Sequence, residues 1–270
     1  MEAETHNAMA RLGIPAEIEL SQYSSVVDIY ERAVANYGDK PAYSSLGHTL
    51  SFNELRDYAY QFASYLQQHS GLKPGDRIAI QMPNLIQYPV VLYGAMLAGM
   101  VIVNTNPLYQ PRELEHQLKD SGAKMLVVLA NVADTAAKVI AKTSVKKVLI
   151  TELADFHPLH KRVAINLAAK HLKNLVPDVE FDSSMSFLKA LSMGDVDQFK
   201  PATINREQLA ALQYTGGTTG VAKGAMLSHR NLVANTLQCK SLFDTYGLQS
   251  GEETLIAPLP LYHIYSFTVG

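Results

Sequence analysis

Short apolar runs rich in β-branched residues alternate with amphipathic segments along the middle of the chain, and this alternation constrains the fold more than any other feature. We expect strands at 76–82, 100–105, 123–129 and 145–151, with helices between them at 85–98, 111–122 and 132–143. Strands that alternate with helices need crossover connections, which produce a mainly parallel sheet covered on both faces. The sequence therefore predicts an α/β fold with a mainly parallel βαβ sheet layered with helices.

Local residue types mark where individual helices begin and end. Pro111 stands at the expected start of one helix and Gly122 directly after its end, where proline and glycine are favoured. Two further amphipathic helices are expected before the sheet, at 24–39 and 51–69. Ser51 and Glu54 have the spacing of a capping box, which predicts that the second helix begins there.

The composition excludes several classes of protein. The 270 residues carry a formal net charge of −2, so no overall positive field favours nucleic acid as a partner. The single cysteine, Cys239, cannot form an internal disulfide and is typical of a reducing compartment. The N-terminus lacks the basic start and apolar core of a signal peptide. We therefore expect a soluble, cytoplasmic protein.

An uncharged stretch at 85–103 is long enough for a membrane span. Gln87, Pro89, Gly94 and Gly99 interrupt it, and it falls where the alternation requires a helix followed by a strand. We interpret the stretch as a buried helix that leads into a buried strand.

A basic segment at 156–177 contains four lysine or arginine residues and no acidic residue. Helical winding places one apolar set on one side and most of the basic residues roughly opposite: Ile165, Ala168, Leu172, Leu175 and Val176 against Arg162, Lys170 and Lys173. Two interpretations stay open. Residues 159–176 make peripheral contact with the inner face of the cell membrane, or they form a surface helix whose apolar side packs on the sheet.

The stretch YTGGTTGVAKGAML, residues 214–227, contains four glycines, three threonines and one lysine. It follows an expected strand at 208–214 and runs into a short strand at 224–229. Glycines bring backbone N–H groups close to an anion, while hydroxyls and Lys223 add donors and positive charge, so this loop suits a polyphosphate. Two known phosphate patterns do not fit. Gly224 replaces the serine or threonine of a Walker-A loop, and the adjacent Gly216 and Gly217 break the dinucleotide fingerprint.

YTGGTTGVAKG resembles the phosphate-binding signature Y-[TS]-[TS]-G-[TS]-T-G-x-P-K-G of the adenylate-forming superfamily, which includes acyl-CoA synthetases, luciferases and peptide-synthetase adenylation domains. The chain departs from it at Gly216, in place of a hydroxyl residue, and at Ala222, in place of proline. This variant is similar to bacterial long-chain fatty-acid–CoA ligases. PLPLYHIYSF at 258–267 resembles the next core motif of the family, and 82–123 also resembles that subfamily.

The resemblance implies a site for ATP and Mg²⁺. The expected ATP-binding residues are Tyr214, Thr215, Gly216, Gly217, Thr218, Thr219, Gly220, Lys223 and Gly224. Thr215 would offer its hydroxyl to Mg²⁺, and Lys223 would neutralise charge on the phosphates. His263 would lie beside the acyl carboxylate, near the mouth of the acyl tunnel. Lys223 and His263 are therefore the expected catalytic residues.

The resemblance also implies an enzyme that activates a long-chain fatty acid in two half-reactions. The carboxylate attacks the α-phosphate of ATP, which gives acyl-adenylate and pyrophosphate, and coenzyme A then displaces AMP to give acyl-CoA. The expected partners are fatty acid, ATP and coenzyme A. A ligase for medium- or short-chain acids is one alternative, and a non-enzymatic nucleotide- or acyl-binding module is another.

Members of this family are longer than this chain, so the resemblance implies the N-terminal part of an enzyme, with an incomplete second lobe and no activity by itself. The expected division has three parts: an N-terminal helical segment at 1–70 that packs with the second lobe, a first α/β lobe at 71–238 that contains the loop 214–224, and the start of the second lobe at 239–270. The sequence leaves open whether the protein forms a homo-oligomer.

Overall fold

The computed structural model describes residues 17–215 and 221–269, together with Arg11 and Pro15. The described residues form a seven-stranded sheet with the strand order β7-β6-β5-β3-β4-β8-β9. Its strands are β3 (Arg77–Gln81), β4 (Val101–Thr105), β5 (Met125–Leu129), β6 (Lys147–Thr151), β7 (Ser184–Ser186), β8 (Leu209–Thr215) and β9 (Lys223–Ser228). Neighbouring strands are parallel except for the antiparallel pair β8 and β9. The predicted mainly parallel α/β sheet is confirmed.

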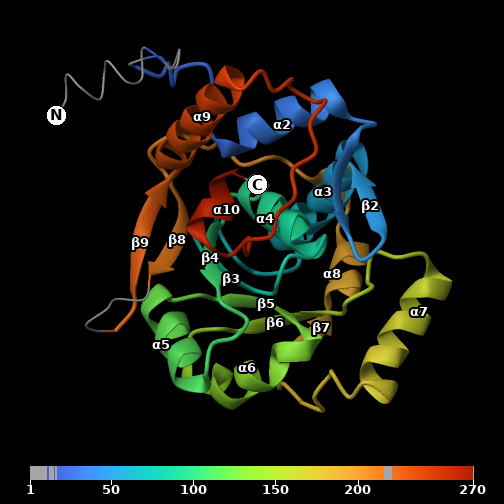
Figure 1. Ribbon diagram of the computed structural model, residues 1–270. Helices are drawn as coiled ribbons and strands as arrows, with labels where there is room; N and C mark the ends of the chain where they lie inside the picture. Colours follow the sequence, from blue (N-terminus) through green and yellow to red (C-terminus); the bar gives the residue numbers. More distant parts are fainter. Residues whose placement is uncertain (1–10, 12–14, 16, 216–220, 270) are drawn as a thin grey trace.

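Helices cover both faces of this sheet (Figure 1). The helices on one face are α3 (Phe52–Gln68), α4 (Gln87–Leu97) and α8 (Phe187–Met193), and those on the other are α5 (Pro111–Ser121) and α6 (Ala133–Val139). Each face has its own apolar core. Phe62 and Phe187 pack in the first, and Leu114 and Leu118 pack in the second. Such two-sided cover explains why the parallel strands are continuous apolar runs.

Helix α4 and strand β4 account for the uncharged stretch at 85–103. Nearly every residue of α4 is buried, and so is every residue of β4. Gly94 allows close packing on α3, because a Cβ there would lie 2.7 Å from the carbonyl oxygen of Ala59. The predicted buried helix and strand are confirmed. Within the residues that the structure describes, no helix is long and apolar enough to cross a membrane.

The predicted helix ends are also present. The Ser51 hydroxyl accepts a hydrogen bond from the Glu54 N–H (3.2 Å), and the Glu54 carboxylate accepts one from the Ser51 N–H (2.8 Å), which completes the capping box. Gly122 ends α5 in the left-handed conformation, with φ of 62°. Several short elements were missed by the sequence analysis: the hairpin of β1 (Pro41–Ser45) and β2 (His48–Ser51), strand β7, helix α8, and α10 (Ile264–Val269).

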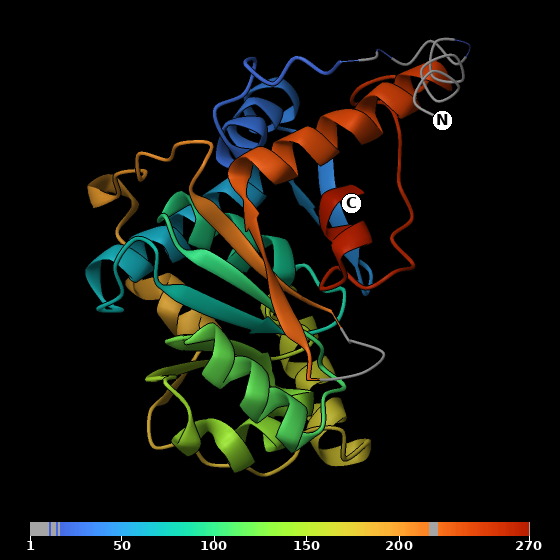
Figure 2. The same cartoon turned by 90° about the vertical axis from the view of Figure 1, so that its left-hand side faces the viewer.

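Helices α2 (Val26–Tyr37) and α9 (His229–Thr245) lie at one end of the sheet, and α9 continues directly from β9 (Figure 2). Helix α9 runs without a break through residue 238, where the sequence analysis placed a domain boundary, and α3 packs on α4 within the first layer. The division at 70 and 238 stays a prediction. Cys239 lies on α9, where burial raises the pKa of its thiol.

The basic segment forms α7 (Leu159–Leu167), which continues as a wider π-helical turn η3 (Ala168–Leu172). It lies at the edge of the molecule, beyond α8 (Figure 1). The apolar side expected from regular winding does not pack on the sheet as a unit, because Leu172 and Leu175 are 80% and 52% exposed. The π-helical turn changes the winding at 168–172, which a constant 100° per residue does not anticipate. The described residues also contain short 3₁₀ turns at Ala130–Val132, Ile140–Lys142 and Val196–Gln198.

Candidate functional site

Strands β8 and β9 form a hairpin at one edge of the parallel sheet (Figure 2). The end of this hairpin next to its connecting loop, termed the loop end, carries several predicted site residues. Thr215 is the direct cross-strand partner of Lys223, and Tyr214 is the partner of Gly224. Residues directly opposite one another in an antiparallel pair share a face of the sheet. The Thr215 hydroxyl and the Lys223 ammonium group therefore start from neighbouring positions on one face. The predicted residues Gly216, Gly217, Thr218, Thr219 and Gly220 lie outside the described residues.

Tyr214 and Gly224 occupy the other face of the hairpin. The Tyr214 hydroxyl donates a hydrogen bond to the Asp120 carboxylate at the end of α5 (2.5 Å). Burial, assisted by Asp120, raises the pKa of Tyr214, so the hydroxyl keeps its proton. A Cβ at Gly224 would lie 2.9 Å from the Tyr214 ring. The structure thus places the Tyr214 side chain in the α5 layer, and the role of both residues in binding ATP stays a prediction.

Gln213 lies on the same face as Thr215, because successive side chains of a strand alternate. Its amide nitrogen donates to the Tyr262 carbonyl oxygen (3.0 Å), and its amide oxygen accepts from Asn104 on β4 (3.0 Å). Gln213 and Asn104 are paired in the register of the two parallel strands. This contact brings the segment before His263 to the face of the hairpin that carries Thr215 and Lys223.

The segment 257–262, termed the bridging segment, leads to His263 and then to α10. The His263 side chain is exposed. Its backbone N–H donates to Pro260 (2.9 Å), and its Nδ1 accepts from the Tyr265 N–H (3.4 Å). Among the residues that the structure describes, no group of three or more histidine, cysteine or acidic residues is arranged to hold a metal ion. A Mg²⁺ ion on ATP takes most of its ligands from phosphate and water, so one hydroxyl such as that of Thr215 fits it.

Three amide residues of this region were missed by the sequence analysis: Asn84, Asn104 and Gln213. Together these side chains are termed the amide clamp. Each stands within or just after an otherwise apolar strand, in QMPN, VIVNT and ALQY. An amide in such a run is the signal that could have identified them, because a buried amide needs partners.

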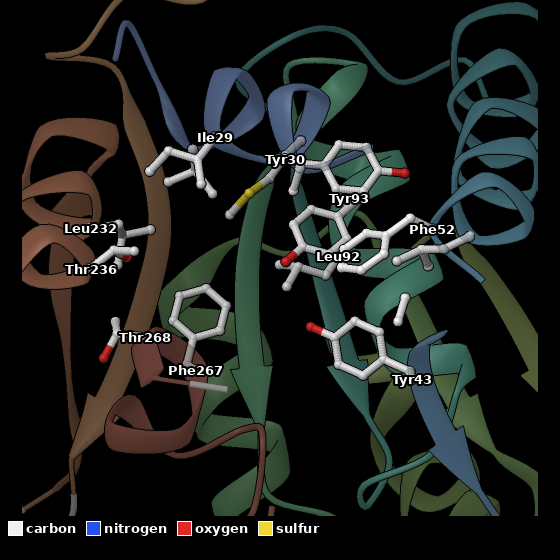
Figure 3. Close-up of a pocket in the computed structure, with 15 residues that line it drawn as sticks. Ile29, Tyr30, Tyr43, Phe52, Leu92, Tyr93, Leu232, Thr236, Phe267 and Thr268 are labelled. Carbon is white, nitrogen blue, oxygen red and sulfur yellow. The ribbon is translucent and has the colours of Figure 1, made fainter. Parts of the chain in front are cut away.

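An apolar cavity of about 270 Å³ lies between α2, α4, α9 and α10 (Figure 3). Phe267 and Thr268 from α10 line one side, and Tyr43 and Phe52 line the other. Because α10 begins directly after His263, the same short helix borders both the cavity and the candidate site.

These features define a class of α/β protein in which a hairpin with a glycine-rich connection extends a parallel sheet, and a second segment that leads to a histidine lies beside this hairpin. The family model for AMP-binding enzymes matches residues 30–270, and the chain therefore belongs to the AMP-binding enzyme family. The predicted membership in the adenylate-forming superfamily is confirmed.

Curated relatives and solved structures agree with this assignment. A long-chain-fatty-acid–CoA ligase of Salmonella typhimurium is 48% identical over 258 residues, which are 95% of this chain and 46% of that protein. A protein of the same name from Bacillus subtilis is 33% identical and is covered to 45%. The crystal structure of a long-chain-fatty-acid-CoA ligase from Archaeoglobus fulgidus matches 91% of this chain and 44% of its own, with 27% identity and a TM-score of 0.70. The chain thus spans about half the length of the relatives it matches.

Proposed function

We propose that the whole protein activates a long-chain fatty acid with ATP and transfers the acyl group to coenzyme A. The fatty carboxylate attacks the α-phosphate and pyrophosphate leaves. The thiolate of coenzyme A then attacks the acyl carbon and AMP leaves. The observation that carries this proposal is the pairing of Thr215 with Lys223 on the face that the bridging segment approaches. Its support is the 48% identity to long-chain-fatty-acid–CoA ligases across nearly the whole chain.

The side chains at the loop end of the hairpin suit the first half-reaction, because attack at phosphorus needs neutralisation of charge more than a proton acceptor. Lys223 supplies a positive charge toward the phosphates, and Thr215 supplies a hydroxyl for Mg²⁺. When bound, Mg²⁺ would neutralise further phosphate charge. His263 follows the bridging segment and is exposed, so its ring is available to the acyl carboxylate.

The test of this site is Lys223→Ala in the whole protein. Removing a charge directed at the transition state costs about 1.4 kcal/mol or more, so fatty-acid-dependent release of pyrophosphate should fall at least tenfold. Lys189→Ala on α8, an exposed lysine far from the hairpin in sequence, is the control and should leave the rate unchanged. Equal rates in both variants would refute the role of Lys223, and no pyrophosphate release by the unaltered protein would favour a non-enzymatic binding module.

Preference for long acyl chains is the finer part of the proposal. Each methylene that leaves water contributes up to about 0.8 kcal/mol, or about fourfold in affinity, so kcat/KM should rise with chain length in a fitted tunnel. The apolar cavity beside α10 supports this preference. A series of fatty acids of graded length measures it. A maximum at a short or medium chain would favour the alternative ligases.

We also propose that α7 contacts the inner face of the membrane, where fatty acid dissolves. Leu159, Val163 and Leu167 follow one another at intervals of four and are 65%, 47% and 53% exposed. Lys161 and Lys170 are exposed on the same helical segment. Exposed apolar side chains and lysines on one helical segment suit an anionic lipid surface, where each lysine contributes about 1 kcal/mol.

Co-sedimentation with vesicles of neutral or acidic phospholipid tests this contact. Lys161→Gln with Lys170→Gln removes two charges and should weaken binding to acidic vesicles about thirtyfold, given about 1 kcal/mol for each charge. Lys119→Gln with Lys138→Gln removes two exposed charges from α5 and α6 and is the matched control. Equal recovery with both kinds of vesicle would identify α7 as a plain surface helix.

A further inference from the structure

The bridging segment has the sequence APLPLY, and the chain just before it contacts the connection between α2 and β1, where the Lys40 ammonium group donates to the Gly251 carbonyl oxygen (2.7 Å). Pro258 and Pro260 have no backbone N–H, so the segment is poorly suited to hold itself in a regular hydrogen-bonded ladder. Its carbonyl groups need donors from elsewhere when they leave water. The amide clamp supplies such donors, although nothing in the proposed reaction uses these side chains directly.

Asn84 holds the first part of the bridging segment. Its amide nitrogen donates to the carbonyl oxygens of Ala257 (2.9 Å) and Leu259 (2.8 Å). Its amide oxygen accepts from the Leu261 N–H (2.7 Å). One side chain, placed just after β3, thus satisfies three backbone groups at alternate residues of the segment.

Gln213 holds the last part of the bridging segment directly, and Asn104 fixes the direction in which the Gln213 amide points. The Tyr262 carbonyl can only accept, so the Gln213 nitrogen must face it. The Gln213 oxygen then faces the Asn104 nitrogen (3.0 Å), and the Asn104 oxygen faces the Tyr88 hydroxyl (2.6 Å). The same hydroxyl lies 3.0 Å from the Leu261 carbonyl oxygen. Burial raises the pKa of Tyr88 well above its usual value, so its proton stays available to these acceptors.

Gln213 occupies a particular place in this network. It lies two residues before Thr215 on the same face of β8, and its partner Tyr262 directly precedes His263. The Gln213 side chain therefore connects β8, which ends at Thr215, with the residue before His263. Gln213 and Asn104 are 5% and 3% exposed, which keeps competing water away from these bonds.

We propose that Gln213 and Asn84 are positioning residues, which hold His263 in place relative to Thr215 and Lys223 during formation of the acyl-adenylate. This inference rests on the proposed function. A purely structural role for these amides predicts a general loss of stability. A positioning role predicts a loss of catalytic rate that occurs only when His263 is present.

The decisive variant is Gln213→Leu in the whole protein, which removes both the donor nitrogen and the acceptor oxygen of the side chain at nearly constant size. The expected result is a kcat about tenfold lower in fatty-acid-dependent ATP–pyrophosphate exchange, with KM for ATP within about twofold, because a misplaced group costs rate rather than ground-state binding. Gln87→Leu is the matched control. Gln87 is also buried, and its amide donates to the Glu152 carbonyl (2.7 Å), outside the bridging segment. This control should keep its kcat.

A double-mutant cycle separates positioning from stability. In a His263→Gln background, Gln213→Leu should change kcat less than about twofold, because residues that act through one another are not additive. The same tenfold loss with and without His263 would overturn the proposal. So would an unchanged kcat in Gln213→Leu itself.

Hydrogen exchange distinguishes a failure of the clamp from a failure of the proposed function. Backbone amides at 261–263 should exchange at least about tenfold faster in Gln213→Leu than in the unaltered protein or in Gln87→Leu, because local opening becomes easier. Unchanged exchange would overturn the clamp whatever the enzyme assay shows. No pyrophosphate exchange in the unaltered protein would instead overturn the proposed function, and with it the catalytic part of this inference.

Discussion

The bridging segment and helix α7 both lie outside the sheet, but they are attached in opposite ways. Side chains on or just after the strands of the sheet, Asn84 and Gln213, donate hydrogen bonds to the backbone of the bridging segment, and the apolar Leu261 of that segment is buried. In helix α7 the helix itself supplies the bonding side chain: Asn166 accepts from the Ala154 N–H and donates to the Glu152 carboxylate, while the leucines of α7 are exposed to solvent. The first arrangement fixes the position of the chain, and the second leaves an apolar surface available for contact. A residue near a reacting centre needs the first arrangement, and a docking surface needs the second.

The largest effect is expected at the loop end of the hairpin, the strand pair to which Gln213 ties the bridging segment. Gly224→Val places new atoms against the Tyr214 ring, which would lie 2.9 Å from the added Cβ. The ring is buried and bonded to Asp120, so relief requires the hairpin to shift, and overpacking of this kind costs about 3 kcal/mol. Urea unfolding measures the change. Met226→Val, at a position that is 70% exposed on the same strand, should stay within about 0.5 kcal/mol.

Acid should weaken the other end of the same hairpin. His229 follows β9, is 3% exposed, and accepts at Nδ1 from the Val26 N–H (3.4 Å). Burial lowers the pKa of His229 from 6.5 to about 4, so the folded state binds this proton less readily than the unfolded state. Its stabilising contribution is full above pH 6.5 and is lost as the pH falls toward 4.

The expected loss from His229 is on the order of 2 kcal/mol between pH 7.5 and pH 5. Unfolding free energies at the two pH values, compared with those of His229→Gln, measure it. The variant should lose most of this pH dependence. An identical slope in the variant would show that other groups cause the acid sensitivity.

Removing an anchoring amide compares the two regions directly. Asn84→Ala breaks three hydrogen bonds to the bridging segment, and because Asn84 is half-buried the cost should be about 1.5 kcal/mol. Asn131→Ala breaks one hydrogen bond, to the Leu175 carbonyl just beyond α7 (3.0 Å), and should cost about 0.5 kcal/mol. Thermal unfolding of both variants measures the difference. Equal costs would mean that the two attachments are alike in strength.

The smallest effect on folding is expected on α7. Leu167→Ser replaces a leucine that is 53% exposed, so the free energy of unfolding should change by less than about 0.5 kcal/mol. Its binding to acidic vesicles should nevertheless weaken, because an apolar contact with lipid is lost. A large loss of stability would place Leu167 in the folded core and remove the contrast with the bridging segment.

The sheet could be predicted because its strands are buried on both faces and are therefore continuous apolar runs. Strands β3, β4, β5 and β6 all appear where the pattern places them. Strand β7, with the sequence SMS, could not be predicted, because three largely polar residues pair only where β6 already presents an edge. The hairpin of β1 and β2 is short and lacks a buried alternating pattern, so its strands gave little signal.

The sequence by itself determined that a loop with glycines, threonines and Lys223 suits a polyphosphate, because these residue types have that chemistry in any fold. Only the tertiary structure decided which face of the hairpin carries Thr215 and Lys223, since a shift of one residue in register would reverse the faces. It also decided that Asn84 bonds to Leu261, 177 residues along the chain. No local pattern encodes such a contact, because its partners meet only after the sheet has formed and the segment before α10 has packed at the carboxyl end of β3.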